Sequence, residues 1–349
     1  LVGGGLASMA AAAYLVRDCR FPGKQITIYE GMHILGGSND GIGTPEKGFV
    51  CRGGRMLNEE TYENFWELFS SIPSLRQPGR SVTEEILDFD HAHPTCAKAR
   101  LVDKDGNILD VKSMGFNQAD RMALLKLLMT DEKKLDNLTI QDWFKETPHM
   151  FETNFWYMWQ TTFAFQKWSS LYEFRRYMNR MIFEFSRIET LEGVTRTPLN
   201  QYDSVIRPLE SYLRKAGVSF MENCEVTDID FEDGHGITAR TLYLKRKVED
   251  TDDTGENGDA VKDSYVFETV QLEKNDICIM TNACMTDSAT LGDFHTPAPA
   301  PEQKPISGEL WAKVAAKKPG LGNPEPFFTK PHETNWLSFT VTCRGDEIL

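Results

Sequence analysis

LVGGGLASMAAAAYLVRD, residues 1–18, decides how the first part of this chain folds. Gly3, Gly5 and the small residue Ser8 follow the pattern G-x-G-x-x-small, in which glycines permit a tight turn and a close approach of the backbone to a pyrophosphate. The alanine-rich run after Gly5 predicts a helix, whose first-turn N–H groups, around Ala7, would face the phosphates. The stretch therefore predicts a turn that binds a dinucleotide.

An acidic residue closes the strand expected after this helix. Residues 25–30, QITIYE, read as a strand that ends at Glu30. An ionised carboxylate only accepts hydrogen bonds, so Glu30 is suited to both ribose hydroxyls of an adenosine. It lies somewhat farther from the glycines than the usual spacing of about 20 residues. The order of turn, helix and acidic strand end predicts a Rossmann-like α/β domain.

A second glycine pair follows the acid. Gly36, Gly37 and Ser38 come after Glu30 in the spacing E-x5-GG. This extension resembles flavoproteins that bind FAD through two dinucleotide-binding segments, so FAD is the expected cofactor. In that superfamily a later strand passes the adenine, and Val226 occupies the corresponding place with its backbone. An ordinary buried valine of a strand explains Val226 nearly as well.

Periodicity and composition divide the chain into four segments. Residues 1–55 form the first part of the FAD-binding domain, and aromatic residues at helical spacing predict a mainly helical, inserted substrate region over 56–199. A helix followed by strands predicts that the FAD-binding domain resumes, with a mixed β region, over 200–295. Its acidic stretch 248–263 is typical of a solvated hairpin insertion. Residues 296–349 read as a linker and the truncated start of a further substrate or cap region.

Composition excludes several classes of function. The chain has 38 basic and 52 acidic residues and a net charge of −14, which argues against a nucleic-acid partner. No apolar run approaches the roughly 20 residues that cross a bilayer. The seven cysteines show no CxxC or CxxH spacing, so the sequence indicates neither a metal site nor a disulfide framework. A cytoplasmic, reducing location is expected.

Longer blocks point to one family. They are LGGSNDG (35–41), GFVCRGGRM (48–56), YENFWELFSSIPSL (62–75), TTFAFQKWSSLYEFRRYMNRM (161–181), NQYDSVIRPL (200–209) and TNACMTDSA (281–289). Together they resemble the oleate hydratases, also called myosin-cross-reactive antigen proteins, across nearly the whole chain. The resemblance implies an FAD-dependent lyase that adds water to the cis double bond of oleic or a related unsaturated fatty acid. The product is a hydroxy fatty acid, with no net redox change.

The resemblance carries further expectations. Family members are usually considerably longer than this chain, so the sequence is expected to be a fragment at both ends. An unsaturated fatty acid is the expected partner, and homodimerisation and peripheral membrane contact are known properties of family members.

In the family a tyrosine and a glutamate share the work of protonating the alkene and orienting water. The tyrosine carries over to Tyr177, directly after Arg175 and Arg176. Their guanidinium groups are expected to favour the phenolate or to hold the ring. From the residues alone, a half-buried tyrosine beside a surface pair of arginines is the simpler interpretation.

The glutamate of the family is replaced here. It immediately follows RGGR in the best-understood members, but Met56 stands at that position and cannot accept a strong hydrogen bond from water. If a helix begins by Leu57, Glu59 and Glu60 share a face with Met56, and either could substitute. Such glutamates also occur in any exposed first helical turn. Water activated by backbone groups near the flavin is the other route.

A loop flanked by arginines precedes this position. Gly53 and Gly54, after Arg52, let the backbone approach a flat ring while a guanidinium group meets phosphate. By resemblance this loop lies near the isoalloxazine, where the flavin orders the loop or supplies charge instead of carrying electrons.

Two other functions stay open. A redox flavoenzyme, such as an amine oxidase or a desaturase, shares the glycine pattern. A catalytically inactive FAD- and lipid-binding protein would account for Met56. The aromatic stripe Phe151, Phe155, Trp159 and Phe163 could line a lipid tunnel, although such stripes more often form a core.

Overall fold

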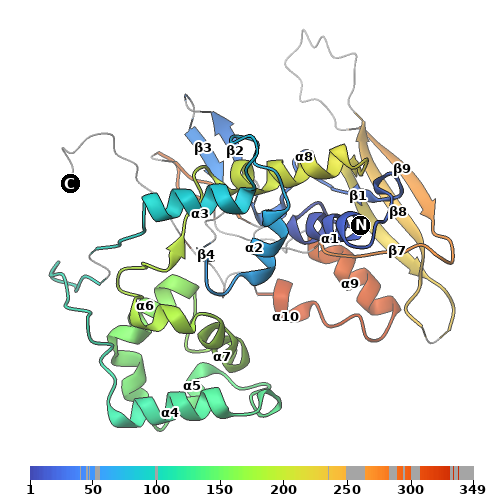
Figure 1. Ribbon diagram of the computed structural model, residues 1–349. Helices are drawn as coiled ribbons and strands as arrows, with labels where there is room; N and C mark the ends of the chain where they lie inside the picture. Colours follow the sequence, from blue (N-terminus) through green and yellow to red (C-terminus); the bar gives the residue numbers. More distant parts are fainter. Residues whose placement is uncertain are drawn as a thin grey trace. The chain divides into compact units, whose positions relative to one another are not determined.

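The protein is described by a computed structural model (Figure 1). The described residues are 1–39, 41–44, 46, 48–51, 56–98, 101–234, 236–248, 264–282, 289–293, 295–299, 307–330, 333 and 337. Contacts divide the chain into two compact units. Unit 1 comprises Leu1–Arg55, Ser71–Val82 and Leu199–Leu349, and unit 2 comprises Met56–Ser70 and Thr83–Pro198.

A short parallel sheet lies at the centre of unit 1. Strand β1 (Thr27–Tyr29) pairs in parallel with β6 (Ser219–Met221), and single parallel bridges place Val2 beside Tyr29 and Met280 beside Val2. Val2 is 3% exposed, as expected for a strand with both neighbours present.

Helices connect these strands. Helix α1 (Leu6–Arg17) leads from the first strand to β1, and α8 (Arg207–Lys215) leads into β6. The two helices pack against each other. Alternating strands and helices around a parallel sheet confirm the predicted mixed α/β fold.

An antiparallel sheet completes the described core of unit 1. Strands β7 (Cys224–Phe231), β8 (Ala239–Val248) and β9 (Ser264–Gln271) are adjacent in this order, and α9 (Ser307–Lys317) packs on β7 (Figure 1). Val248 pairs with Ser264, as a hairpin insertion requires, while residues 249–263 lie outside the described residues.

The smaller elements of unit 1 are short. They are η1 (Gly23–Gln25), η2 (Gly37–Asn39), the antiparallel pair β2 (Gly41–Thr44) and β3 (Gly48–Cys51), the π-helix η6 (Tyr202–Ile206) and α10 (Glu325–Phe328). Helix α3 (Val82–Ala92) begins at the last residue of a unit 1 segment and continues in unit 2.

Unit 2 is mainly helical. Its elements are α2 (Glu63–Ser70), α4 (Gln118–Met129), η3 (Glu132–Lys134), α5 (Ile140–Trp143), η4 (Pro148–Glu152), α6 (Asn154–Phe163), α7 (Leu171–Arg180), η5 (Ile182–Ser186), and the antiparallel pair β4 (Leu57–Asn58) and β5 (Val194–Thr195). The side chain of Thr153 accepts from the Trp156 amide and begins α6, and Ala164 ends it in the left-handed conformation. Ser170 caps α7 in the same way as Thr153 caps α6.

The core of unit 2 is aromatic. Phe155 and Trp159 are fully buried, and they pack against each other and against Phe185. This burial fits the core interpretation of the aromatic stripe. Within the described part of the chain, no helix is both long and apolar enough to cross a bilayer.

Candidate functional site

The glycine turn of unit 1 leads directly into α1. Gly3 has a φ of +96°, which L side chains rarely adopt. Gly5 is the N-cap residue and offers no side-chain cap, so the first-turn N–H groups are open to a ligand or to solvent. Ala7 is exposed in this turn. Ser8 is buried, with its Oγ 2.6 Å from Thr281 Oγ1, and it joins the helix to the strand segment around Met280.

Gly4, which the glycine pattern leaves unassigned, holds the acidic residue. Its N–H donates to Glu30 Oε2 at 2.7 Å, and the Met32 N–H donates to Oε1 at 2.9 Å. A Cβ on Gly4 would lie 2.9 Å from Glu30 Cβ and 2.8 Å from a methyl carbon of Leu35. Only glycine therefore allows this approach. Three consecutive glycines, where the pattern needs two, were the signal in the sequence.

The second glycine pair packs on the first turn, backbone against backbone. The Gly36 N–H donates to the Gly4 carbonyl at 2.9 Å. Gly36 and Gly37 have φ values of +108° and +56°, and a Cβ on Gly37 would lie 3.3 Å from Gly5 Cα. Ser38 follows in η2 and is half-buried. The two predicted dinucleotide segments thus lie side by side.

The strand that carries Val226 begins beside Glu30. The Cys224 N–H donates to the Glu30 carbonyl at 2.8 Å. Val226 is 6% exposed and pairs with Leu244 of β8. The strand of Val226 thus begins beside the acidic residue, and the backbone role of Val226 toward an adenine stays a prediction.

These residues fit a dinucleotide such as FAD. The open amides and the positive end of α1 suit a pyrophosphate, the Glu30 carboxylate suits ribose hydroxyls, and the glycines leave no Cβ between backbone and ligand. Arg52, Gly53 and Gly54, the expected isoalloxazine loop, lie outside the described residues. No group of three or more His, Cys, Asp or Glu side chains in the described ranges is placed to hold a metal ion.

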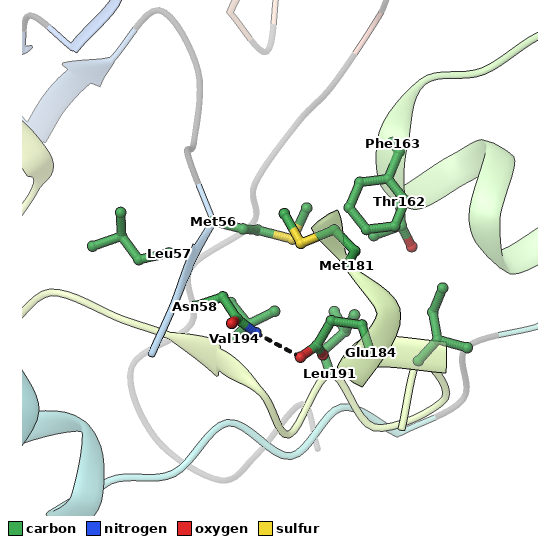
Figure 2. A pocket seen from close by; sticks show the side chains of 10 residues that line it. Met56, Leu57, Asn58, Thr162, Phe163, Met181, Glu184, Leu191 and Val194 are labelled. Carbon is green, nitrogen blue, oxygen red and sulfur yellow. Dashed lines mark hydrogen bonds between the residues drawn. The ribbon is translucent and has the colours of Figure 1, made fainter. Parts of the chain in front are cut away.

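Unit 2 contains a small apolar pocket with a single buried carboxylate (Figure 2). The space open to the centre of a water-sized sphere is about 10 Å³. Residues from four parts of unit 2 line it: Met56, Leu57, Asn58, Thr162, Phe163, Met181, Glu184, Ile188, Leu191 and Val194. Figure 2 shows the side chains of Met56 and Met181 directed toward each other and the Glu184 carboxylate directed toward Asn58.

Glu184 uses only one of its two oxygens. Its Oε1 accepts from Asn58 Nδ2 at 2.7 Å and from Arg187 Nη2 and Nε at 2.8 and 3.1 Å. Its Oε2 is buried and has no hydrogen-bond partner among the described residues. The sequence reading missed Glu184. A glutamate inside the apolar run MIFEF (181–185) was the available signal, because charge in such a run is rarely buried without a partner.

The helix expected to begin by Leu57 does not form. Leu57 and Asn58 instead form β4, and α2 begins at Glu63. The reason is the Asn58 side chain, whose Oδ1 accepts from the Glu60 N–H at 3.0 Å and turns the chain, while its Nδ2 is held by Glu184. The shared helical face of Glu59 and Glu60 with Met56 was therefore wrong.

Glu59 and Glu60 have separate partners. Glu59 Oε2 lies 3.0 Å from His91 Nε2, and the hydrogen bond from this carboxylate raises the pKa of His91 above 6.5. Glu60 Oε1 accepts from Arg187 Nη2 at 2.7 Å. Partial burial raises the pKa of Glu60, but the hydrogen bonds from Arg187 and from backbone N–H outweigh it and hold the pKa below 4.5. The lowered pKa makes the Glu60 carboxylate a weaker base than an unperturbed one.

Tyr177 lies on α7 at the edge of the aromatic core. It is 38% exposed, and its ring meets those of Phe163 and Phe165 edge-on at 5.8 and 5.2 Å between centroids. Phe163 also lines the pocket. The Met181 N–H donates to the Tyr177 carbonyl at 2.8 Å, and the Glu184 N–H donates to the Met181 carbonyl at 3.0 Å. Tyr177 on α7 and Glu184 on η5 thus lie on consecutive helices that meet at Met181.

The two arginines before Tyr177 belong to another cluster. Arg175 Nη1 and Arg176 Nη2 each donate to Glu132 at 3.1 Å, and the Arg176 guanidinium lies 4.5 Å from the centroid of the Tyr172 ring. The Glu132 carboxylate binds both guanidinium groups, and an action of either on Tyr177 stays a prediction.

Known proteins resemble this chain along its length. It is 42% identical to a linoleate hydratase of Lactiplantibacillus plantarum over 99% of this chain and 61% of that protein. It is 34% identical to an oleate hydratase of Streptococcus pyogenes serotype M49 (strain NZ131) over 100% of this chain and 56% of that protein. The chain therefore spans about three fifths of the length of the curated relatives it matches.

Likeness to solved structures is weaker. A fatty acid isomerase from P. acnes that produces CLA gives a TM-score of 0.41 at 14% identity, over 70% of this chain and 54% of that one. Similarity at this level carries no argument about activity or cofactor. The decisive comparison is with family models: the model described as the MCRA family matches residues 1–349, and the chain belongs to that family.

Proposed function

We propose that this protein is an FAD-dependent fatty acid hydratase, a hydro-lyase that adds water to the cis double bond of oleic or a related unsaturated fatty acid. The observation that carries the proposal is the full-length match to the MCRA family, with relatives named linoleate hydratase and oleate hydratase. A cytoplasmic location, homodimerisation and peripheral membrane contact belong to the same proposal as family traits.

FAD is proposed to bind at the glycine turn of unit 1. The pyrophosphate would meet the first-turn amides of α1, and Glu30 would accept from the ribose. The remaining residues proposed for the cofactor are Gly3, Gly5, Ala7, Ser8, Gly36, Gly37, Ser38, Arg52, Gly53, Gly54 and Val226. The bound flavin would supply charge or order near the reacting carbons, since hydration needs no electron transfer.

The protein must supply an acid, an acceptor that orients water, and a dry site. Tyr177 is proposed as the acid that protonates one alkene carbon while water oxygen bonds to the other. The rings of Phe163 and Phe165 meet the Tyr177 ring edge-on. Glu59 and Glu60 stay candidates for the acceptor; Glu59 pairs with His91, and Glu60 pairs with Arg187.

The test is hydration in labelled water. The full chain, loaded with FAD, is incubated with oleic acid in oxygen-18 water, and the fatty acids are analysed by mass spectrometry. The expected product is hydroxystearic acid that carries the label, and Tyr177→Phe is expected to lose it. Bleaching of the flavin by substrate would indicate a redox flavoenzyme instead. Unreacted oleate with FAD still bound would indicate a binding protein.

A further inference from the structure

We infer that Glu184 orients the attacking water, in place of the carboxylate that the family carries at position 56. This inference rests on the proposed hydratase function and assigns a catalytic residue to it. The residue lies in η5, away in sequence from the loop where the family places its acid.

The first observation is a buried oxygen that no described residue satisfies. Glu184 is 4% exposed, and its Oε1 alone takes the three hydrogen bonds from Asn58 and Arg187. The Oε2 atom is buried without a partner among the described residues. An ionised carboxylate offers acceptor positions on both oxygens, so a donor is expected at Oε2.

The second observation is the space beside Glu184. The pocket that it lines admits the centre of a water-sized sphere over about 10 Å³, which is close to the smallest space that holds a water molecule. Met56, Met181 and Phe163 form much of the wall and neither donate nor accept strong hydrogen bonds. Glu184 is the only ionisable side chain among the described lining residues, where Asn58 and Thr162 supply the other polar side chains.

The third observation is the relation to Met56 and Tyr177. Met56 lines the same pocket, so Glu184 presents a carboxylate at the place where the family glutamate is missing. Phe163, which also lines the pocket, contacts the Tyr177 ring. The acid and the water-orienting carboxylate thus belong to one cluster of side chains.

The position of the Glu184 carboxylate requires glycine at residue 193. A Cβ on Gly193 would overlap Glu184 Oε1 and the Arg187 guanidinium. The Gly193 carbonyl also accepts from Asn58 Nδ2 at 3.2 Å. Glycine at this position therefore permits the close packing of Glu184 Oε1, Arg187 and Asn58.

The step balances without any redox partner. The O–H bond of Tyr177 breaks and its proton bonds to one alkene carbon, while water oxygen bonds to the other carbon. The water gives one proton to Glu184 Oε2. That proton later returns through solvent to the Tyr177 phenolate, so alkene plus water becomes alcohol and the enzyme is restored.

Glu184→Gln is the decisive variant, because the amide keeps size and an oxygen for Arg187 but places a donor in the pocket. We expect kcat for labelled hydroxystearic acid to fall by about 100-fold or more, with KM and FAD binding within about threefold of wild type. Met56→Glu in the Glu184→Gln background should recover at least about tenfold in kcat, because it returns a carboxylate to the pocket.

Asp120→Asn is the matched control. Asp120 is also fully buried in unit 2, lies 2.7 Å from His149 through Oδ2, and leaves Oδ1 without a partner among the described residues, but it does not line the pocket. Asp120→Asn should lower the midpoint of thermal unfolding and leave kcat per folded molecule within about threefold of wild type. If Glu184→Gln accumulates too little folded protein, Gly193→Ala moves the carboxylate without removing it and should lower kcat in the same way.

The outcomes separate the two proposals. Wild-type kcat in folded Glu184→Gln, or loss equal to that of Asp120→Asn, would overturn the role of Glu184 while leaving the hydratase intact. Absence of rescue by Met56→Glu would do the same. Absence of labelled product from the wild-type protein would overturn the hydratase itself, and the role of Glu184 with it.

Discussion

At the residue scale, Gly4 is glycine because Glu30 occupies the space where a side chain would lie. The Gly4 N–H is 2.7 Å from Glu30 Oε2, so one hydrogen bond sets the distance between turn and acid. Any side chain must move the acid or the turn. The Glu30 carboxylate is thereby fixed before a ribose arrives, which lowers the entropic cost of binding.

Gly4→Ala is expected to weaken FAD binding by at least about tenfold, since overpacking of this kind costs about 1–3 kcal/mol and 1.4 kcal/mol corresponds to tenfold. The dissociation constant is measured by titrating the apoprotein with FAD and monitoring flavin fluorescence. Gly236→Ala is the control, because among the described residues a Cβ there would meet only Thr238 Oγ1, at 3.9 Å. Equal affinities for both variants would contradict the assigned role of Gly4.

The ion pair of Glu60 with Arg187 predicts a dependence of stability on pH. The folded-state pKa of Glu60 lies below 4.5, so the pair stabilises the fold above pH 4.5 and loses this effect as pH falls through the folded pKa. Glu60→Gln should therefore lower the free energy of unfolding at pH 7, by no more than about 1 kcal/mol for so exposed a pair. In acid, the stability of the variant should converge with that of wild type, as urea denaturation would show.

The pair of Glu59 with His91 predicts the opposite dependence of stability on pH and serves as the comparison. The folded-state pKa of His91 is above 6.5. The pair therefore stabilises the fold below pH 6.5, and this stabilisation disappears as pH rises through the folded-state pKa. The stability of Glu59→Gln should approach that of wild type at high pH instead of at low pH. Parallel pH profiles for the two variants would contradict both assignments.

At the element scale, the strand β4 and the turn after it depend on one side chain. Asn58 is 2% exposed, donates to Glu184, and accepts from Glu60 N–H and from Thr61 Oγ1 at 3.0 Å each. These bonds explain why Leu57 and Asn58 form a strand where side-chain spacing predicts a helix. Asn58 and Glu184 are 126 residues apart, so no local pattern could reveal the pairing.

Asn58→Ala is expected to destabilise unit 2 by about 2–3 kcal/mol, because it leaves several buried groups without partners. Asn58→Asp, of almost the same shape, places a second carboxylate beside Glu184 and should be worse at pH 7 than at pH 5. Chemical denaturation at both pH values measures the difference. A Asn58→Asp variant that is insensitive to pH would show that the two side chains do not meet.

The elements of the proposed flavin site could be predicted much more fully. The turn at Gly3, the helix after it, Glu30 and the Gly36–Gly37 pair follow one another within 37 residues, in the order and spacing of a dinucleotide-binding segment. Local spacing therefore carries the information. The arginines beside Tyr177 could not be assigned, because Glu132, which binds them, lies more than 40 residues away in sequence.

At the scale of the whole molecule, the two units should respond differently to cofactor. The proposed FAD residues belong to unit 1. Five of the seven tryptophans belong to unit 2, namely Trp66, Trp143, Trp156, Trp159 and Trp168. Calorimetry reports both units, whereas tryptophan fluorescence reports mainly unit 2.

FAD at 100 times its dissociation constant should stabilise unit 1 by about 2.7 kcal/mol, because it binds the folded state. We expect the calorimetric transition of unit 1 to rise and the tryptophan transition to shift less. Riboflavin is the control, since it lacks the pyrophosphate and the adenosine that the turn and Glu30 would bind. A response to riboflavin equal to that to FAD would contradict the proposed mode of binding.

The central strand of the parallel sheet also sets the order of biosynthesis. Val2 pairs on one side with Tyr29 and on the other with Met280, and Ser8 meets Thr281 across 273 residues of sequence. A ribosome releases the N-terminal turn long before it makes the segment that closes the sheet beside it. Closure across so many residues is slow. During synthesis, Val2 therefore lacks one of its two neighbouring strands until the segment around Met280 has been made.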